Sequence, residues 1–442
     1  MARSCDRCGA EPEAGKAFPQ TRKAFRVKGK PLCPSCTQKR QKAEQCWIFF
    51  WVALWTVVIV MGLPGNRDVL LERVLFHLVF AVALLSPLSV MIHELAHALA
   101  GKLCGFRVFS VEFGWQGKSL IHTRIGETRW ILRWFPSGGI CRLAPRSRDG
   151  LRLKTFIVVA AGPLSNLFIL ALVACHVSWD TLWSVTPLFA GFHPWYLLFW
   201  VNVSLLYRAL FPKRHTSPLN PGLSSDGLQM WLLLKNDPTL LEETHKAYYV
   251  MQVAYEMEQK KIAEAEALLA EGQRHYPDDV LLQVVKGSLD YQKGELPKAI
   301  EGLEGALEHL DDQSAYAYLL RNNLAYFIAV VGDPARLSEA ETLSREALAA
   351  CPGVGAFLGT RGAVLVRLTK NEEGLEFLWK SLKDSPDSES QGENLTWMAL
   401  AHFQLGQREK AGELLRRASK HGPTFPVFEE VSKLLAPSPC RV

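Results

Sequence analysis

Apolar residues are concentrated in the first half of this 442-residue chain. Residues 46–64 contain no charged side chain, and further mostly apolar stretches cover residues 69–103, 155–177 and 193–211. An apolar stretch of about 18 or more residues is long enough for a helix to cross a bilayer. The pattern therefore predicts a polytopic helical membrane core with about four spans.

The segments that connect these stretches differ in positive charge. Lys and Arg are frequent before residue 46, between residues 105 and 154 and directly after residue 211, whereas residues 65–68 and 178–192 together contain one Arg. The cytoplasmic loops of membrane proteins carry the excess of Lys and Arg. The asymmetry predicts a multi-pass membrane protein whose N- and C-terminal regions both lie in the cytosol.

The loop at residues 105–154 has a pattern that is typical of strands. Residues 108–113, 120–124 and 128–134 alternate between apolar and polar side chains or are rich in β-forming residues, and glycines separate them. We expect a small β loop attached to the helical core. Its edge could pair with an extended peptide, although the residues alone fit an ordinary cytosolic hairpin equally well.

The second half of the chain contains an internal repeat. A small residue is followed by Gly seven positions later and by Ala twelve positions later. The sets are Gly287, Gly294 and Ala299, and Ala399, Gly406 and Ala411; Ala325 and Gly332 begin a third. This spacing is typical of tetratricopeptide repeats, in which small residues let paired helices pack closely. It predicts about five helix pairs, with a generic helical bundle as the alternative.

Four of the ten cysteines form two Cys-x-x-Cys pairs near the N-terminus. They are Cys5, Cys8, Cys33 and Cys36. One such pair could be a redox pair, but two pairs are typical of a structural zinc knuckle with four thiolate ligands. Because zinc-binding thiols indicate a reducing compartment, this site agrees with a cytosolic N-terminus.

Composition and charge limit the remaining possibilities. Hydrophobic residues make up 48% of the chain and charged residues 21%, which excludes a disordered protein. The net charge of +6 is mild and dispersed, so we expect the lipid bilayer and proteins as partners and no nucleic acid. The predicted fold is mostly α: a polytopic membrane helical core with a small β loop, followed by an α-solenoid of helix-pair repeats. The predicted domains are a zinc-knuckle segment (1–45), the membrane core (46–240) and the cytosolic repeats (241–442).

The sequence His93-Glu94-Leu95-Ala96-His97 is the strongest chemical signal. Residues four apart share one face of a helix, so His93 and His97 could bind one Zn²⁺ while Glu94 accepts a proton from water on the metal. The alternative is a pair of packed or hydrogen-bonded histidines. The surrounding residues are nearly all apolar, and such polar groups are costly at membrane depth unless they are functional.

Three further motifs follow this one along the chain. They are Phe135-Pro136-Ser137-Gly138-Gly139, Ala161-Gly162-Pro163-Leu164-Ser165-Asn166 and Asp226-Gly227. Together, in this order and over about residues 69–235, the four motifs resemble those of the site-2 proteases, which are intramembrane zinc metalloproteases. Two departures stand out: a long polar stretch separates Pro212 from Asp226, and Ser225 replaces the usual Leu before Asp-Gly.

The resemblance implies a metal site and its chemistry. His93, His97 and Asp226 would bind the catalytic zinc, with His215 as the rival to Asp226, and Glu94 would act as the general base. With the cysteine knuckle, the chain would bind one catalytic and one structural zinc.

The resemblance also implies a substrate. Gly138, Gly139 and Asn166 would contact it, and Asn202 is a second polar residue in an apolar span. The implied activity is hydrolysis of membrane-anchored proteins within or near the bilayer, in regulated intramembrane proteolysis, with protein partners bound by the repeats. Two alternatives are an inactive membrane scaffold that displays the repeats, and a metalloprotease that acts on soluble or membrane-surface peptides with its site open to the cytosol.

Overall fold

The computed structural model describes most of the chain from residue 67 onward. The described ranges are 67–114, 119–133, 138–184, 193–213, 224–308, 310, 315–350, 352, 354–384, 388–421 and 426–436. The predicted zinc-knuckle cysteines, Cys5, Cys8, Cys33 and Cys36, and the first predicted span, residues 46–64, lie outside these ranges. The chain divides into two compact units, and the boundary falls between Tyr248 and Tyr249.

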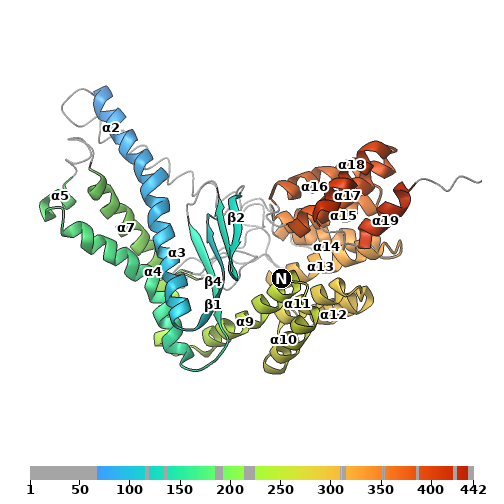
Figure 1. Cartoon of the computed structure of the whole chain (residues 1–442), viewed down its shortest axis with the longest axis horizontal. Coiled ribbons are helices and arrows are strands. Elements are labelled where there is room, and N and C mark those ends of the chain that lie inside the picture. The colour runs from blue at the N-terminus through green and yellow to red at the C-terminus, as the bar shows by residue number, and fades with distance from the viewer. Residues whose placement is uncertain are drawn as a thin grey trace, which may run out of the picture. The chain divides into compact units, whose positions relative to one another are not determined.

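The first unit is built from helices and one small sheet (Figure 1). Its helical elements are α2 (Arg67–Phe80), the π-helical turn η1 (Ala81–Leu85), α3 (Ser86–Leu103), α4 (Leu151–Ala174), α5 (Trp179–Trp183), α7 (Pro194–Leu210) and α8 (Asp226–Leu234). Among the described residues, two helical segments are long and apolar enough to cross a membrane, namely Glu72–Leu103 and Leu151–Ala174. These two segments correspond to the second and third of the four spans expected from the sequence. The fourth corresponds to α7, which has 17 residues and does not meet this criterion.

The sheet occupies the loop where strands were predicted. It consists of β1 (Phe106–Phe113), β2 (Ser119–Ile125), β3 (Thr128–Arg133) and β4 (Gly139–Pro145) in the order β2-β3-β1-β4. β1 pairs parallel with β3 and antiparallel with β4, whereas β2 and β3 are antiparallel. The sequence analysis missed β4, because its residues include Gly and Pro and do not alternate clearly between apolar and polar.

One face of the sheet packs on α3. Ala98 of α3 is in the same buried cluster as Val108, Val111 and Phe113 of β1. Since apolar side chains alternate along a strand, this burial fixes which face of β1 points toward the helix. It also brings β4, the neighbour of β1, beside α3.

The second unit is an array of antiparallel helix pairs (Figure 1). The helices are α9 (Pro238–Glu258), α10 (Ile262–His275), α11 (Val280–Gln292), α12 (Leu296–Glu308), α13 (Ala315–Val331), α14 (Leu337–Ala350), α15 (Gly355–Arg367), α16 (Asn371–Asp384), α17 (Ser388–Gln404), α18 (Arg408–Ala418), the 3₁₀ turn η2 (Ser419–His421) and α19 (Pro426–Leu435). One continuous buried core extends through this unit from Val284 to Val431. The predicted helix-pair repeats are thus confirmed.

The repeat spacing has a direct structural cause. Gly294, Gly332 and Gly406 follow the first helix of a pair with φ angles of +79°, +73° and +75°, a conformation that glycine adopts without strain. Gly287 lies against Leu303 of the paired helix, where an added Cβ would come within 3.1 Å of the Leu side chain. Glycine therefore ends the first helix and also lets the two helices pack closely.

Candidate metal centre

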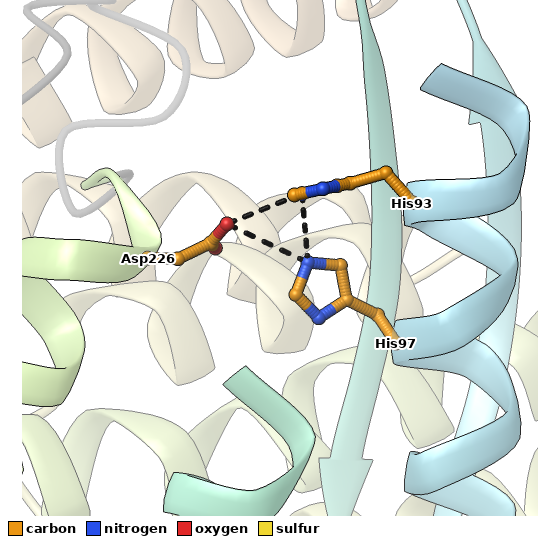
Figure 2. A group of neighbouring side chains, drawn as sticks. All are labelled: His93, His97 and Asp226. Atoms are coloured by element: carbon orange, nitrogen blue, oxygen red, sulfur yellow. Dashed lines mark hydrogen bonds and ion pairs between the residues drawn. The ribbon is translucent and has the colours of Figure 1, made fainter. Parts of the chain in front are cut away.

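Three predicted ligands from two distant parts of the chain meet in the first unit (Figure 2). His93 and His97 lie one turn apart on the same face of α3, and Asp226 is the first residue of α8. The distances are 3.2 Å between the two Nε2 atoms, 3.2 Å from His93 Nε2 to Asp226 Oδ2 and 3.7 Å from His97 Nε2 to Asp226 Oδ2. No other group of three His, Cys, Asp or Glu side chains that could hold a metal occurs among the described residues.

The spacing of these atoms fits a zinc ion. Zn–N and Zn–O bonds of about 2.0–2.1 Å in tetrahedral geometry separate neighbouring ligand atoms by roughly 3.3 Å. The three observed distances fall close to this value. Two imidazoles and one carboxylate are also a ligand set that leaves the fourth zinc position open, as in catalytic sites.

Hydrogen bonds at the far side of each imidazole orient the Nε2 atoms. His93 Nδ1 donates to Asn166 Oδ1 at 2.6 Å, and His97 Nδ1 donates to the backbone carbonyl of Val158 at 2.7 Å. Both acceptors are oxygens without a hydrogen, so the proton must be on Nδ1. Each Nε2 therefore keeps a free lone pair for a metal, as expected of histidine ligands with an ordered outer shell.

A series of buried hydrogen bonds extends from Asn166, the partner of His93. Asn166 Nδ2 donates to Asn202 Oδ1 at 2.8 Å, and Asn202 Nδ2 donates to Ser89 Oγ at 3.1 Å and to the Leu198 carbonyl at 2.9 Å. Asn166, Asn202 and Ser89 have no exposed surface. The sequence analysis named both asparagines but missed Ser89. The sequence signal that could have identified Ser89 is its position one helical turn before His93.

Glycine provides the space that the metal-binding side chains occupy. At Gly162 on α4, an added Cβ would lie 2.3 Å from His97 Nε2 and 2.6 Å from His93 Nε2. At Gly139 on β4, it would lie 2.4 Å from Cγ of Glu94. The Gly-Pro and Gly-Gly motifs therefore let α4 and β4 approach α3 closely enough to enclose the site.

Glu94 lies between the two histidines in sequence and is buried at the edge of the site. Its side chain packs against Gly139, and the backbone of Cys141 hydrogen-bonds its carboxylate. Gly138, the other glycine of this motif, accepts a hydrogen bond from Gly114 N–H at 2.6 Å through its carbonyl. The start of β4 is thereby fixed beside the general-base candidate.

Asp226 carries the negative charge of the cluster. Burial raises the pKa of this carboxyl, but the neighbouring His93 and His97 side chains outweigh burial and lower the pKa to about 2. The next residue, Gly227, lies against the backbone carbonyl of Leu210, where no Cβ would fit. The rival ligand His215 lies outside the described residues, as do Phe135, Pro136 and Ser137.

Comparison with protein families agrees with this site. Residues 79–179 match the model of Peptidase family M50, the family of the site-2 proteases, so the resemblance to that family is confirmed. The match contains the first three motifs and ends before Asp226-Gly227. A provisionally named zinc metalloprotease of Neisseria meningitidis is 32% identical over 111 residues, which cover 22% of this chain and 23% of the relative. A similarly named protein of Clostridium perfringens is 31% identical over 106 residues, which cover 22% of this chain and 31% of the relative. The chain thus spans about a quarter to a third of these relatives.

Part of the chain is also similar to solved structures. A tetratricopeptide repeat protein of Thermus thermophilus has a TM-score of 0.34 at 14% identity and covers 43% of this chain and 98% of its own. MamA of Desulfovibrio magneticus RS-1 has a TM-score of 0.29 at 14% identity and covers 40% and 94%.

Proposed function

We propose that this protein is an intramembrane zinc metalloprotease that hydrolyses membrane-anchored proteins within or near the bilayer, in regulated intramembrane proteolysis. The observation that carries the proposal is the convergence of His93 Nε2, His97 Nε2 and Asp226 Oδ2 at zinc-ligand spacing beside a buried Glu94. The match to Peptidase family M50 supports the reaction class.

The residues around the cluster divide the chemistry between them. His93, His97 and Asp226 would hold the metal, and Asn166 and the Val158 carbonyl keep both imidazoles in the tautomer that leaves Nε2 free to bind it. When bound, zinc supplies Lewis acidity, which polarises a peptide carbonyl and lowers the pKa of water toward ~7. The chain's own contribution is to present three ligands and leave the fourth direction open.

Glu94 moves the proton. Its carboxylate takes a proton from the attacking water and then delivers it to the leaving amine, so one side chain acts as general base and then as general acid. Its position one residue from His93 and its contact with β4 hold the carboxylate beside the metal ligands.

The outer surface of the helical core supports a place in the bilayer. Large apolar side chains of α3 and α4 are exposed, including Leu99 at 61%, Leu103 at 80% and Phe168 at 64%. Exposed leucines and phenylalanines on long apolar helices suit contact with lipid tails. We infer a multi-pass protein with cytosolic termini from this surface and from the Lys and Arg asymmetry of the loops.

The sheet suggests how substrate is held. A transmembrane helix buries its carbonyls in its own hydrogen bonds, so it must unwind before a carbonyl can be attacked. β4 lies at an edge of the sheet and begins beside Glu94. We infer that the extended substrate contacts Gly138 and Gly139 there and Asn166 from α4, and that the helix pairs recruit protein partners.

The test is zinc content and proteolysis of the full chain purified in detergent. Wild type should hold one zinc that disappears in the His93→Ala/His97→Ala variant, and a second zinc that disappears when Cys5 and Cys8 are replaced. Wild type should also cleave a membrane-anchored reporter, and the histidine variant should not. A wild-type chain that binds no zinc at the histidines and cleaves nothing would favour the inactive scaffold.

A further inference from the structure

The polar stretch before Asp226 poses a structural problem. Residues 214–223 lie outside the described residues and make the connection from α7 to α8 long. A longer connection ordinarily allows its ends more freedom. Asp226 nevertheless lies within 3.7 Å of both imidazoles.

Ser225 joins the two ends of this connection. Its backbone N–H donates to the Lys213 carbonyl at 2.8 Å, and its Oγ accepts from Lys213 N–H at 3.0 Å. The same Oγ donates to the carbonyl of Phe211 at 2.8 Å and accepts from Leu228 N–H at 3.4 Å. A hydroxyl has one donor and two acceptor sites, so every site of this buried Oγ is used.

These four hydrogen bonds link the end of α7 to the start of α8. Phe211 directly follows α7, Lys213 is the last described residue before the polar stretch, and Leu228 is in the first turn of α8. The close approach of Gly227 to the Leu210 carbonyl makes a second contact at the same junction. Only one peptide unit separates the Ser225 Cα from the Cα of Asp226, so a shift of Ser225 would move the carboxylate directly.

We propose that Ser225 is a positioning residue for the metal site: its hydroxyl joins the two ends of the polar stretch and thereby holds Asp226 in place as the third zinc ligand. A leucine at this position would keep the backbone hydrogen bond to Lys213 but could not make the three hydrogen bonds of the hydroxyl. This inference rests on the proposed zinc site. It explains how the chain keeps a ligand geometry that the longer connection would otherwise loosen.

The test compares zinc affinity and the visible spectrum of the cobalt-substituted site in the full chain, purified in detergent. All variants carry Cys5→Ser and Cys8→Ser, so that only the membrane-core metal is counted. Ser225→Ala should weaken zinc binding by about 10-fold or more, as loss of an outer-shell partner does, and should alter the cobalt spectrum. Ser225→Thr retains the hydroxyl and should restore the wild-type spectrum.

Ser178→Ala is the matched control. Ser178 also caps a helix in the first unit, accepting from Thr181 N–H at 3.4 Å, and its partners lie in α5 rather than at the α7–α8 junction. Its loss should leave zinc affinity and the cobalt spectrum unchanged. Circular dichroism of each variant would confirm that the helical content is retained.

A second comparison addresses the polar stretch itself. Four Gly/Ser residues are inserted between Leu219 and Asn220, once with Ser225 and once with Ser225→Ala. With Ser225 present, zinc affinity should change by less than about twofold, because the hydrogen bonds of Ser225 still join the two ends of the stretch. Without it, the insertion should weaken binding beyond the effect of Ser225→Ala alone.

The outcomes separate this inference from the proposed function. If Asp226→Ala binds zinc as tightly as the parent, the ligand assignment fails and the role of Ser225 fails with it. If Asp226→Ala loses zinc while Ser225→Ala retains parental affinity and spectrum, the zinc site stands and the positioning role is overturned.

Discussion

At the scale of single residues, the site depends on a few atoms that fill specific positions. The tautomer of His93 is fixed by the amide oxygen of Asn166, and that of His97 by the backbone carbonyl of Val158. Gly162 and Gly139 have no side chain, and this leaves room for the two imidazoles and for Glu94.

Replacing Glu94 with Gln should remove activity but leave the metal. The amide keeps the shape of the side chain but cannot accept a proton, so proteolysis should fall by about 10²–10⁴-fold. Zinc bound by His93, His97 and Asp226 should be retained, as measured by metal analysis of the purified protein. Glu127→Gln, at an exposed position, serves as the control. Activity of Glu94→Gln within a few-fold of wild type would exclude Glu94 as the general base.

Replacing Gly162 with Ala should abolish metal binding. The added methyl carbon would lie 2.3 Å and 2.6 Å from the two Nε2 atoms, well inside van der Waals contact. Either the imidazoles turn away or α4 moves outward, and both responses separate the ligands. Metal analysis should find no zinc at the histidines, whereas Ala161→Gly on the same helix should keep it. Full zinc occupancy in Gly162→Ala would show that the helix pair is looser than the structure indicates.

At the scale of elements, the site depends on how α8 is held at both ends. Its first residue faces α3, and its last carbonyls are held by α4: Arg152 Nε donates to the Leu233 carbonyl at 2.7 Å and Nη2 to the Leu234 carbonyl at 3.1 Å. A cation at a helix C-terminus also interacts favourably with the helix dipole. The same helix that presents Gly162 and Asn166 thus anchors the element that carries Asp226.

Arg152→Ala should weaken zinc binding modestly. Loss of a cation at a helix C-terminus costs about 0.5–1 kcal/mol, which corresponds to roughly 2–5-fold in affinity if the effect is passed on to Asp226. Competition with a zinc chelator would measure it. Lys154→Ala, which removes the same charge two residues further along α4, is the control. Equal affinities for Arg152→Ala and wild type would mean that the start of α8 alone fixes the ligand.

Aromatic side chains make contacts between different helix pairs of the second unit. Tyr291 of α11 donates its hydroxyl proton to Glu393 of α17 at 3.2 Å, although two helix pairs lie between them in sequence. Tyr326 of α13 contacts Trp397 of α17 with ring centroids 6.4 Å apart. The first helices of the pairs therefore share one packed core, which links repeats that are distant in sequence.

Trp397→Ala should destabilise the array strongly. The indole is 2% exposed and is also contacted by Arg367 at 5.1 Å, so its truncation leaves a large cavity. The expected loss in free energy of unfolding is about 3–5 kcal/mol, measured by urea denaturation followed by circular dichroism. Trp379→Ala, at a position 41% exposed, should cost less than half as much. Comparable losses for the two variants would contradict a shared core around Trp397.

At the scale of the whole molecule, the proposal combines a membrane metalloprotease core with a helical array in one chain. The two units have separate cores, and the boundary falls within α9. This organisation suits an enzyme whose partners bind at one unit while the chemistry takes place in the other.

Topology reporters test the membrane arrangement. The number of Lys and Arg in each loop predicts that reporters at Ala10, Ser147 and Val442 lie in the cytosol. Reporters near Asn66 and Thr186 should read the opposite side. The measurement is the activity of a compartment-sensitive fusion at each position. A cytosolic reading at Thr186 would contradict the four-span arrangement and would separate Asp226 from the histidines across the membrane.

Features that depend on neighbours along the chain could be predicted from the sequence. The apolar stretches gave long helices, and the small-residue spacing gave helix pairs with Gly294 and Gly406 at their turns. His93 and His97 share a face because residues four apart on any helix do so. Each of these follows from local geometry, which a single sequence contains.

Features that depend on contacts between distant segments were decided only by the tertiary structure. β4 has weak strand character of its own and exists because β1 offers it a partner. Ser89 and Asn202 meet 113 residues apart, and Asp226 joins His93 across 133 residues. The reason is physical: hydrogen bonds and metal-ligand geometry depend on positions in space to within tenths of an ångström, and only the packing of α3, α4, α7 and α8 determines those positions.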